Sequence, residues 1–335
     1  MAKRKTDEYI FADSYLGVHA SRLIPRNDLL RIAGSRNLEG AAQILRDYDY
    51  EETKELTEGD VDGFLRREEE ALKNSVLGII PDPTELEFQF YPADFRNAAV
   101  IIKTEKMGKP LSEEALSNAG SIPASRILED LRDKKYSDLP EELRSGAVKA
   151  EDTFAKGRDP QVIDLILDQA LAKAMVRNAE ESGEDFLIEV VRRRIDRINL
   201  GTFVRLRELG RDWTSLRDVF LEGGNISLEL LVSVYGEPYA RVGERMDSYG
   251  FSRAFLEGGK TLKETGSVAF LERLLDDAVM GYVKQVKYDS FGVNVIEGYL
   301  YAKQSELRNL RIALTGCQLG FAAEEMEERL RETYE

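Results

Sequence analysis

The chain has 335 residues, of which 42% are hydrophobic, and its 47 basic and 62 acidic side chains give a formal net charge of −15. This length corresponds to about two domains, or one large domain, and is enough to bury a core. So negative a charge argues against nucleic-acid partners, whose phosphates require Lys and Arg, and against broad adsorption to anionic lipid.

Cysteine and histidine are too few for several kinds of site. The single cysteine, Cys317, has no partner for an internal disulfide, which is typical of a reducing compartment. The single histidine, His19, excludes zinc sites with two or three histidines and would have to serve in any catalytic triad. No run approaches the ~18 apolar residues of a membrane span, and no signal-peptide stretch follows Met1–Asp7. We therefore expect a soluble cytoplasmic protein without metal or cofactor.

Apolar residues mostly recur at intervals of three and four, which is helical spacing. The only strand signal, Leu86–Tyr91, alternates but is isolated and cannot build a sheet. A long helix is predicted after Asp159 at its N-cap, with Pro160 in its first turn and Gly183 as its C-cap. A second long helix is predicted over 185–208, antiparallel to the first. Its inward residues should be Phe186, Val190, Ile195, Ile198, Phe203 and Leu206.

The rest of the chain adds loops and one further helical stretch. In residues 324–335, Met326 and Leu330 keep helical spacing in an acidic segment. The composition predicts loops at 49–63, 80–92, 120–123, 134–140 and 235–239. The fold class predicted from these patterns is all-α.

One pattern occurs three times along the chain. Counted from an asparagine, each copy has an acid at −3, apolar residues at +1, +4, +5 and +10, and a glycine at +11. The three copies are Asp94, Asn97 and Gly108; Asp196, Asn199 and Gly210; and Glu306, Asn309 and Gly320. The asparagines are 102 and 110 residues apart.

Each position of the repeat has a physical interpretation. Positions +1, +4 and +5 lie on one face of a helix, and the acid and asparagine are helical neighbours that can face one crossing point. Asparagine is unfavourable inside a helix, so three recurrences indicate that its amide binds something fixed in the tertiary structure. The glycine at +11 is typical of a helix end.

The segments after the first two glycines also resemble each other. Leu116–Ile122 and Phe220–Ile226 each precede an apolar helix, whereas the chain ends soon after Gly320. Because Leu30–Tyr50 carries a similar pattern, we infer that residues 8–50 complete the third unit. We predict a single body over 1–335 with repeats at about 88–150, 185–260 and 285–335, closed into a pseudo-three-fold ring or funnel.

These segments resemble the C subunit of the archaeal and bacterial A/V-type ATPases, the counterpart of the d subunit of the vacuolar enzyme. The resemblance rests on Tyr15–Ile24, Leu38–Tyr50, Asp94–Asn97 with Lys103, Asp196–Leu200 with Arg205 and Arg207, Phe220–Gly224, and Phe291–Arg311. It covers nearly the whole chain. This sequence departs from the family pattern at Ala98 and Ala99, which replace a usual Leu-Lys, and at Thr315, where the other copies have a basic residue.

The resemblance implies an all-helical funnel of three units and no catalytic site. It would lie on the cytoplasmic side of the membrane, peripherally, upon the membrane rotor ring, and its cavity would receive the foot of the central shaft. It would pass torque between shaft and ring, so that ATP hydrolysis or synthesis is coupled to ion transport. The ring selects H⁺ or Na⁺ in such complexes.

Other interpretations compete with this one. The chain could be a helical repeat scaffold with unrelated protein partners, or an enzyme that uses carboxylates or His19. The segment Glu257–Thr261 ends like a phosphate-binding loop, but Ala254 stands where that loop requires glycine, so we expect a structural turn. We expect Arg192–Arg194 and Arg197 to form a solvated face with i,i+4 ion pairs, and Cys317 to be a small core residue.

Overall fold

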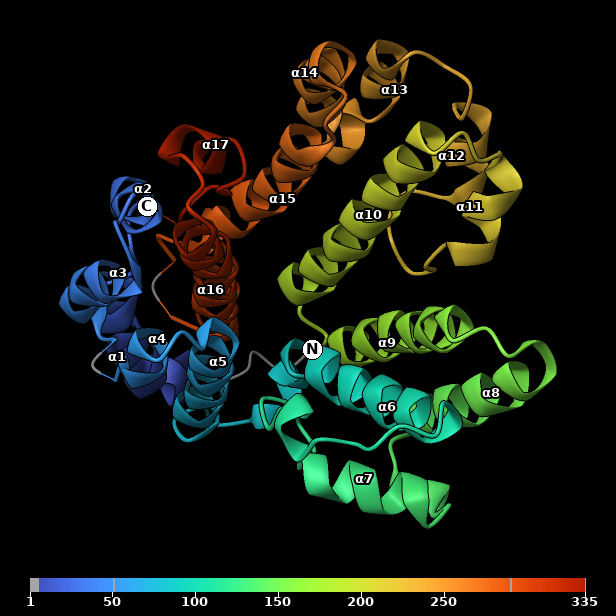
Figure 1. Ribbon diagram of the computed structural model, residues 1–335, viewed down its shortest axis with the longest axis horizontal. Coiled ribbons are helices and arrows are strands. Elements are labelled where there is room, and N and C mark those ends of the chain that lie inside the picture. Colours follow the sequence, from blue (N-terminus) through green and yellow to red (C-terminus); the bar gives the residue numbers. More distant parts are fainter. Residues whose placement is uncertain (1–5, 51, 290, 335) are drawn as a thin grey trace.

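A computed structural model describes residues 6–50, 52–289 and 291–334, so the start of the chain at Met1–Lys5 lies outside the described residues. Helices make up all the regular secondary structure of these ranges, which confirms the predicted all-α class. Figure 1 shows the helices in three groups, each built on one long helix: α16 (Val293–Leu319), α6 (Tyr91–Lys106) and α10 (Asp185–Glu208). None of the described helices has the length and apolar character that a membrane span needs.

The first group joins the two ends of the chain. N-terminal helices pack around α16, and the short C-terminal helix lies against α2. Its other elements are η1 (Thr6–Tyr9), α1 (Ile10–Ala20), α2 (Arg26–Ala33), α3 (Leu38–Leu45), η2 (Arg46–Tyr48), α4 (Lys54–Thr57), α5 (Val61–Leu77) and α17 (Ala323–Glu327). These helices bury one cluster of apolar side chains, which extends into the neighbouring groups.

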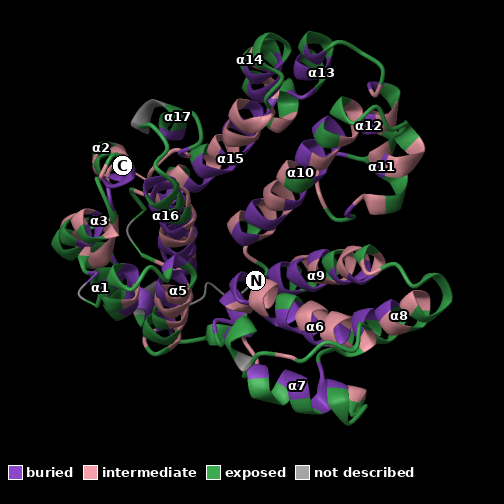
Figure 2. Cartoon of the chain, viewed as in Figure 1, coloured by how far each residue is buried: buried purple, intermediate pink, exposed green. Residues whose placement is uncertain are grey.

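The second group is built on α6, and the third on α10. With α6 come η3 (Pro83–Gln89), η4 (Glu113–Ala115), α7 (Ala124–Arg132), η5 (Tyr136–Asp138), α8 (Glu141–Gly157) and α9 (Gln161–Ser182). With α10 come α11 (Trp213–Val219), α12 (Leu228–Ser233), α13 (Tyr239–Arg245), η6 (Asp247–Tyr249), η7 (Ala254–Gly258), α14 (Gly259–Thr265), α15 (Ala269–Val283) and η8 (Lys284–Val286). Each group buries its own apolar cluster, and Figure 2 shows the buried faces turned toward neighbouring helices.

The two longest predicted helices are present with nearly the predicted bounds. Helix α9 begins at Gln161, whose N–H is bound by the Asp159 carboxylate at 2.9 Å, and it ends before Gly183, which has φ +69°. Helix α10 spans the predicted residues 185–208, and the pair diverges from the short connection between them (Figure 1). One inward position was wrong: Ile198 is 41% exposed, although the next residue, Asn199, is buried.

Local hydrophobic patterns were less reliable at three places. The alternating stretch at Leu86–Tyr91 lies in the 3-10 helix η3 and the start of α6, where Leu86, Phe88 and Phe90 are buried. Three of the predicted loops contain short helices, namely α4, η3 and η5. The C-terminal helix is only five residues long, yet Met326 and Leu330 are buried, so the rest of the tail is held by tertiary contacts.

Candidate partner-binding site

Each repeat asparagine is buried and binds both backbone groups of a single residue that follows 20 or 22 positions later. The partners are Ser117 for Asn97, Leu221 for Asn199 and Arg331 for Asn309. The Nδ2 atom donates to the partner's carbonyl at 2.7, 2.8 and 3.2 Å, respectively. The Oδ1 atom accepts from the partner's N–H at 3.0, 2.9 and 2.9 Å. A carboxamide is the side chain that can do both, because it carries a donor and an acceptor.

The acid at −3 holds the segment that leads into the next short helix. Asp94 accepts from the N–H groups of Ser121 (2.9 Å) and Ile122 (3.1 Å), just before α7. Asp196 accepts from Asn225 (3.1 Å) and Ile226 (2.9 Å), just before α12.

In the third copy the partner of the acid comes from the other end of the chain. Glu306 accepts from the N–H of Ile24, just before α2, and from the hydroxyl of Tyr50 at 2.6 Å. The C-terminal tail therefore supplies the partner of Asn309, through Arg331, whereas the N-terminal segment supplies the partner of Glu306.

The length of the acid matches the residue that faces it. In the first two copies, Gly120 and Gly224 lie against the aspartate, and a Cβ at either glycine would overlap the carboxylate. The corresponding position of the third copy, two residues before Ile24, is Arg22, and there the acid is a glutamate. The glutamate reaches one methylene further, which compensates for a backbone that lacks the glycine.

The three glycines at +11 end their helices in the same way. Gly108, Gly210 and Gly320 have φ of +63°, +66° and +71°, which is unfavourable for other residues. The next residue in each case donates its N–H to a carbonyl five positions back, at 2.9, 2.9 and 3.0 Å. The apolar residues before these glycines, Met107, Leu209 and Leu319, are 45%, 72% and 64% exposed. Each long helix therefore ends in an exposed apolar side chain.

Buried charges connect the groups where the long helices meet. Asp276 of α15 pairs with Arg197 of α10 at 2.6 Å and with Arg331 of the tail at 2.6 Å. The two guanidinium groups hold the pKa of Asp276 below its usual value even though burial acts in the opposite direction. A single carboxylate thus ties together three segments that lie far apart in the sequence.

The prediction of a solvated arginine face on α10 was wrong for Arg194 and Arg197. Among the described residues, Arg193 alone of this set makes the expected i,i+4 pair, with Glu189 at 2.7 Å. Arg194 instead donates to the side chain of Gln89 at 2.8 Å, and Arg197 reaches Asp276. The cause is tertiary, because η3 and α15 lie alongside this face of α10.

A second buried acid lies on α16. Glu297 is fully buried and accepts from the side-chain amide of Gln89, while its Oε2 has no hydrogen-bond partner among the described residues. Burial raises the pKa of Glu297 to about 7, although Gln89 and the nearby Arg194 act in the opposite direction. The sequence pattern did not single out this residue.

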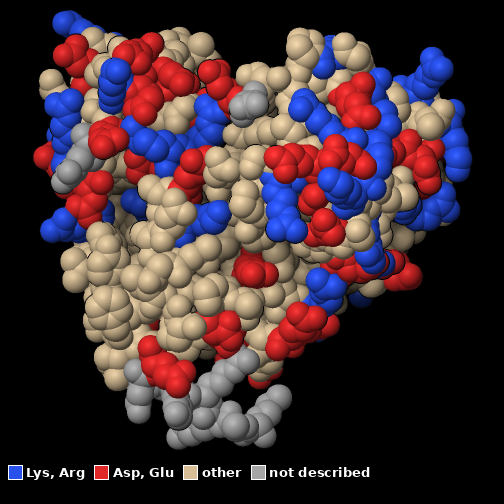
Figure 3. Space-filling view, turned by 90° about the horizontal axis from the view of Figure 1, so that it is seen from below, with Lys and Arg blue, Asp and Glu red and all other residues tan. Residues whose placement is uncertain are grey.

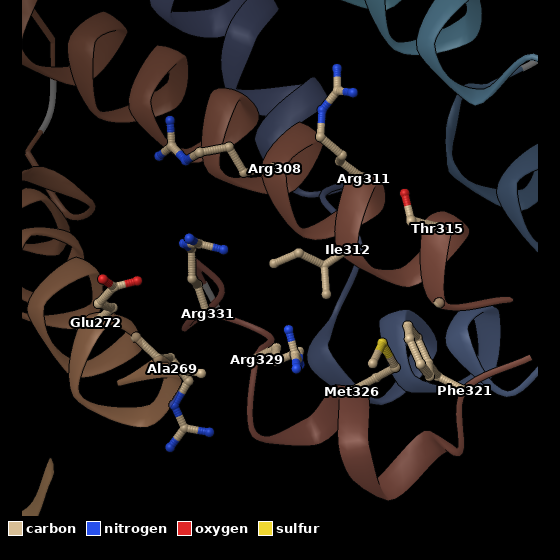
Figure 4. A pocket seen from close by; sticks show the side chains of 12 residues that line it. Ala269, Glu272, Arg308, Arg311, Ile312, Thr315, Phe321, Met326, Arg329 and Arg331 are labelled. Carbon is tan, nitrogen blue, oxygen red and sulfur yellow. The ribbon is translucent and has the colours of Figure 1, made fainter. Parts of the chain in front are cut away.

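Two cavities open beside this charged centre. One of about 530 Å³ lies between α15, α16 and the C-terminal tail (Figure 4), and one of about 210 Å³ lies between α5, α6, α10 and α16. Arg308 lines both, and Arg96 lines the smaller one. Sequence analysis missed these arginines, yet a signal was present, because each directly precedes a repeat asparagine.

The other singled-out residues have structural surroundings. A Cβ at Gly258 would lie 2.7 Å from the Cα of Leu271, and one at Gly259 would lie 2.6 Å from the Cβ of Tyr239, so both glycines serve close helix packing. His19 packs on Tyr15, with its Nδ1 3.4 Å from Asp49. Cys317 is buried, as expected. In the described part of the chain, no group of three or more His, Cys, Asp and Glu side chains could hold a metal ion.

Comparison with known proteins identifies related chains. The model of the ATP synthase (C/AC39) subunit family matches residues 14–329. The C subunit of the V-type sodium ATPase of Enterococcus hirae is 23% identical over 277 residues, which cover 82% of this chain and 83% of that protein. The C subunit of the A-type ATP synthase of Desulfurococcus sp. is 21% identical over 349 residues, with 97% and 91% coverage. That of Thermococcus gammatolerans is 22% identical, with 98% and 91% coverage.

The asparagine contacts predict a shared cost of mutation. Asn97→Ala, Asn199→Ala and Asn309→Ala should each lower the free energy of unfolding by about 1–3 kcal/mol, because each leaves a buried backbone N–H and C=O unpaired. Denaturant unfolding of the purified variants measures this. Asn27→Ala, at an exposed position of α2, should stay within about 0.5 kcal/mol of the parent chain. Three neutral variants would show that the amides have no common structural role.

The close approach at the acids predicts a steric effect. Gly224→Ala should destabilise the chain by about 1–3 kcal/mol, because the added methyl overlaps the Asp196 carboxylate. The matched control is Gly201→Ala, on the same helix as Asp196. A Cβ added at Gly201 would meet no atom within 4 Å apart from its chain neighbours and the backbone of its own helix, so this variant should be more stable by up to about 1 kcal/mol. Thermal unfolding midpoints that move in the same direction for both variants would contradict the prediction.

Burial of the aspartates predicts a dependence on pH. Burial raises the pKa of Asp196 to about 6, although the N–H groups of Ile226 and Asn225 act in the opposite direction. Between pH 4 and 6 the folded chain therefore holds this proton while the unfolded chain releases it. The parent chain should lose up to about 3 kcal/mol relative to Asp196→Asn as the pH rises through this interval.

Urea unfolding of both chains at pH 4, 5, 6 and 7 tests this difference. The exposed Glu39→Gln variant removes one negative charge elsewhere and serves as the control. An unchanged difference between the parent chain and Asp196→Asn across the four pH values would rule out a raised pKa for Asp196.

Proposed function

The chain belongs to the ATP synthase (C/AC39) subunit family, and from that premise we propose that it is the non-catalytic coupling subunit of the central rotor of an A/V-type ATPase. In this role it links the central shaft to the membrane rotor ring and carries torque between ATP hydrolysis or synthesis and ion transport. The family match over residues 14–329 is the observation that carries the proposal. The relatives, which are named as C subunits, support a role without a catalytic site of its own.

We further propose that the three helix groups are equivalent units around a hollow axis. The units comprise about 88–150, 185–260 and 285–335, the last completed by 8–50. Support comes from the matching asparagine, acid and glycine contacts, which recur in all three groups with similar distances. The three separate apolar clusters give each unit its own core.

A part that carries torque must resist deformation, and the buried contacts supply stiffness. The Asn and acid contacts join segments that are 20 to 30 positions apart in the first two units. In the unit built on α16, the acid contact joins Glu306 and Ile24, which are 282 positions apart in the sequence. The carboxylate of Asp276 pairs with Arg197 of α10 and with Arg331 of the tail, and so connects the unit built on α10 with the unit built on α16. Packed interiors of this kind transmit strain rather than absorb it.

The outer surface supports protein contacts at more than one face. Figure 3 shows one face of the molecule, on which a stretch of uncharged surface lies beside intermixed acidic and basic side chains. Helix α1 presents Phe11 and Val18, which are 67% and 57% exposed. Exposed apolar patches of this kind are typical of interaction sites. We propose that the chain lies peripherally on the cytoplasmic side and is held by the ring and shaft without inserting into the membrane.

Purification of the intact membrane complex through a tag on this chain tests the proposal. We expect shaft and ring subunits to elute with it in mild detergent, and we expect electron cryomicroscopy to place it on the rotor axis between them. The isolated chain should show no ATP turnover.

Three results would contradict this assignment. A position on the stator, away from the axis, would remove the coupling role. Purification with unrelated proteins, and without shaft or ring, would favour an independent helical scaffold. Turnover by the isolated chain that depends on carboxylates or on His19 would favour an enzyme.

A further inference from the structure

The larger cavity is lined by an unusual number of arginines for a chain of net charge −15. Five of its twelve lining residues are arginines, whereas Glu272 is the only acidic one. The arginines are Arg273 of α15, Arg308 and Arg311 of α16, and Arg329 and Arg331 of the tail. Figure 4 shows Arg329 and Arg331 between α15, which carries Glu272, and α16, which carries Ile312.

Ion pairs neutralise only part of this charge. Arg273 lies 3.7 Å from Asp277, Arg331 lies 2.6 Å from Asp276, and Arg311 pairs with Asp62. The one lining acid, Glu272, is already paired with Arg205 at 2.6 Å. Arg308 and Arg329 form no ion pair with an acidic side chain among the described residues, and Asp276, the acid that acts on Arg308, is already paired with Arg197 and Arg331.

Arg308 is the more unusual of the two. The side chain is half-buried, its Nε is buried without a hydrogen-bond partner among the described residues, and its guanidinium carbon lies 5.5 Å from the centre of the Tyr301 ring. Burial lowers the pKa of Arg308, and Arg197 and Arg331 act in the same direction, whereas Tyr301 and Asp276 act in the opposite direction. Burying a charge in this way is unfavourable unless a partner supplies the opposite charge.

We propose that this cavity is a binding site for a carboxylate-rich segment of a protein partner, with Arg308 and Arg329 binding its acidic side chains. Guanidinium groups pair with carboxylates through two parallel hydrogen bonds, which makes arginine suited to this task. Because Arg308 also lines the smaller cavity, it lies where α16 faces α6 and α10.

The form of the cavity favours a polypeptide over a small phosphate-bearing ligand. The uncompensated arginines come from α16 and from the tail, so they address separate acidic groups instead of converging on one phosphate. The wall also carries the apolar residues Ile312, Phe321 and Met326. This alternation of charged and apolar surface matches the aliphatic stems and carboxylates of successive Glu and Asp side chains.

The inference rests on the proposed function for the identity of the partner, which is then the central shaft. The binding chemistry itself can be tested on the isolated full chain. At 0.15 M salt, where the Debye length is about 8 Å, long-range repulsion by the net negative charge is screened and local pairing dominates.

Calorimetric titration with a hexaglutamate peptide tests the site. We expect one peptide to bind per chain, and we expect Arg308→Gln and Arg329→Gln each to weaken binding about tenfold or more. The matched control is Arg132→Gln, since Arg132 is exposed on α7 and has no acidic partner among the described residues. This control removes the same charge and should change the affinity less than twofold. Inorganic phosphate in the same assay should bind at least tenfold more weakly than the peptide.

Several outcomes would overturn the inference: no binding of hexaglutamate, equal weakening by Arg132→Gln, or phosphate binding as tight as the peptide. Arg308→Gln removes a half-buried charge that forms no ion pair among the described residues, so its melting temperature should not fall; if this variant does not fold, Arg329→Gln at an exposed position decides. A chain that assembles with the shaft but does not bind hexaglutamate overturns this inference alone. A chain that binds the peptide but does not assemble with the shaft overturns only the proposed function.

Discussion

The architecture depends on one interaction, in which a buried carboxamide inside a long helix binds both backbone groups of one residue in a passing segment. Backbone N–H and C=O groups that leave water need partners, and segments without regular structure cannot provide their own. Asn97, Asn199 and Asn309 meet that need without charge. The acid one turn earlier then orients the residues that lead into the next helix. Together the two side chains fix the path of an irregular segment against a rigid element.

This arrangement explains why two ends of the chain meet on α16. Helices α6 and α10 find both partners in the residues that follow them, whereas α16 finds only the partner of Asn309 there. The tail reaches Asn309 through Arg331, and the N-terminal segment reaches Glu306 through Ile24. Segments near opposite ends of the chain are thus joined through α16 by buried hydrogen bonds, which is consistent with the proposed role in carrying torque.

Positively charged side chains are concentrated at one place in a chain whose net charge is negative. The chain has a net charge of −15, yet arginines gather where α10, α15, α16 and the tail approach each other. Asp276 pairs with both Arg197 and Arg331, whereas Arg308 forms no ion pair among the described residues. Such a centre stabilises the isolated chain poorly and becomes favourable when an acidic partner arrives. In the proposed complex, assembly would therefore depend on the charge of the partner.

The helical class, the bounds of α9 and α10, and the three Asn positions could be predicted from the sequence, because local spacing, capping and glycine chemistry act over a few residues. Local patterns could not show that Arg194 and Arg197 turn inward, that Ile198 stays exposed, or that Arg308 borders two cavities. Those outcomes depend on which distant helix covers each face, and on residues such as Gln89 and Asp276 that bring partners from far along the chain. The composition of the charged centre depends on contacts between residues far apart in the sequence, whereas the helices that carry it were determined by neighbouring residues alone.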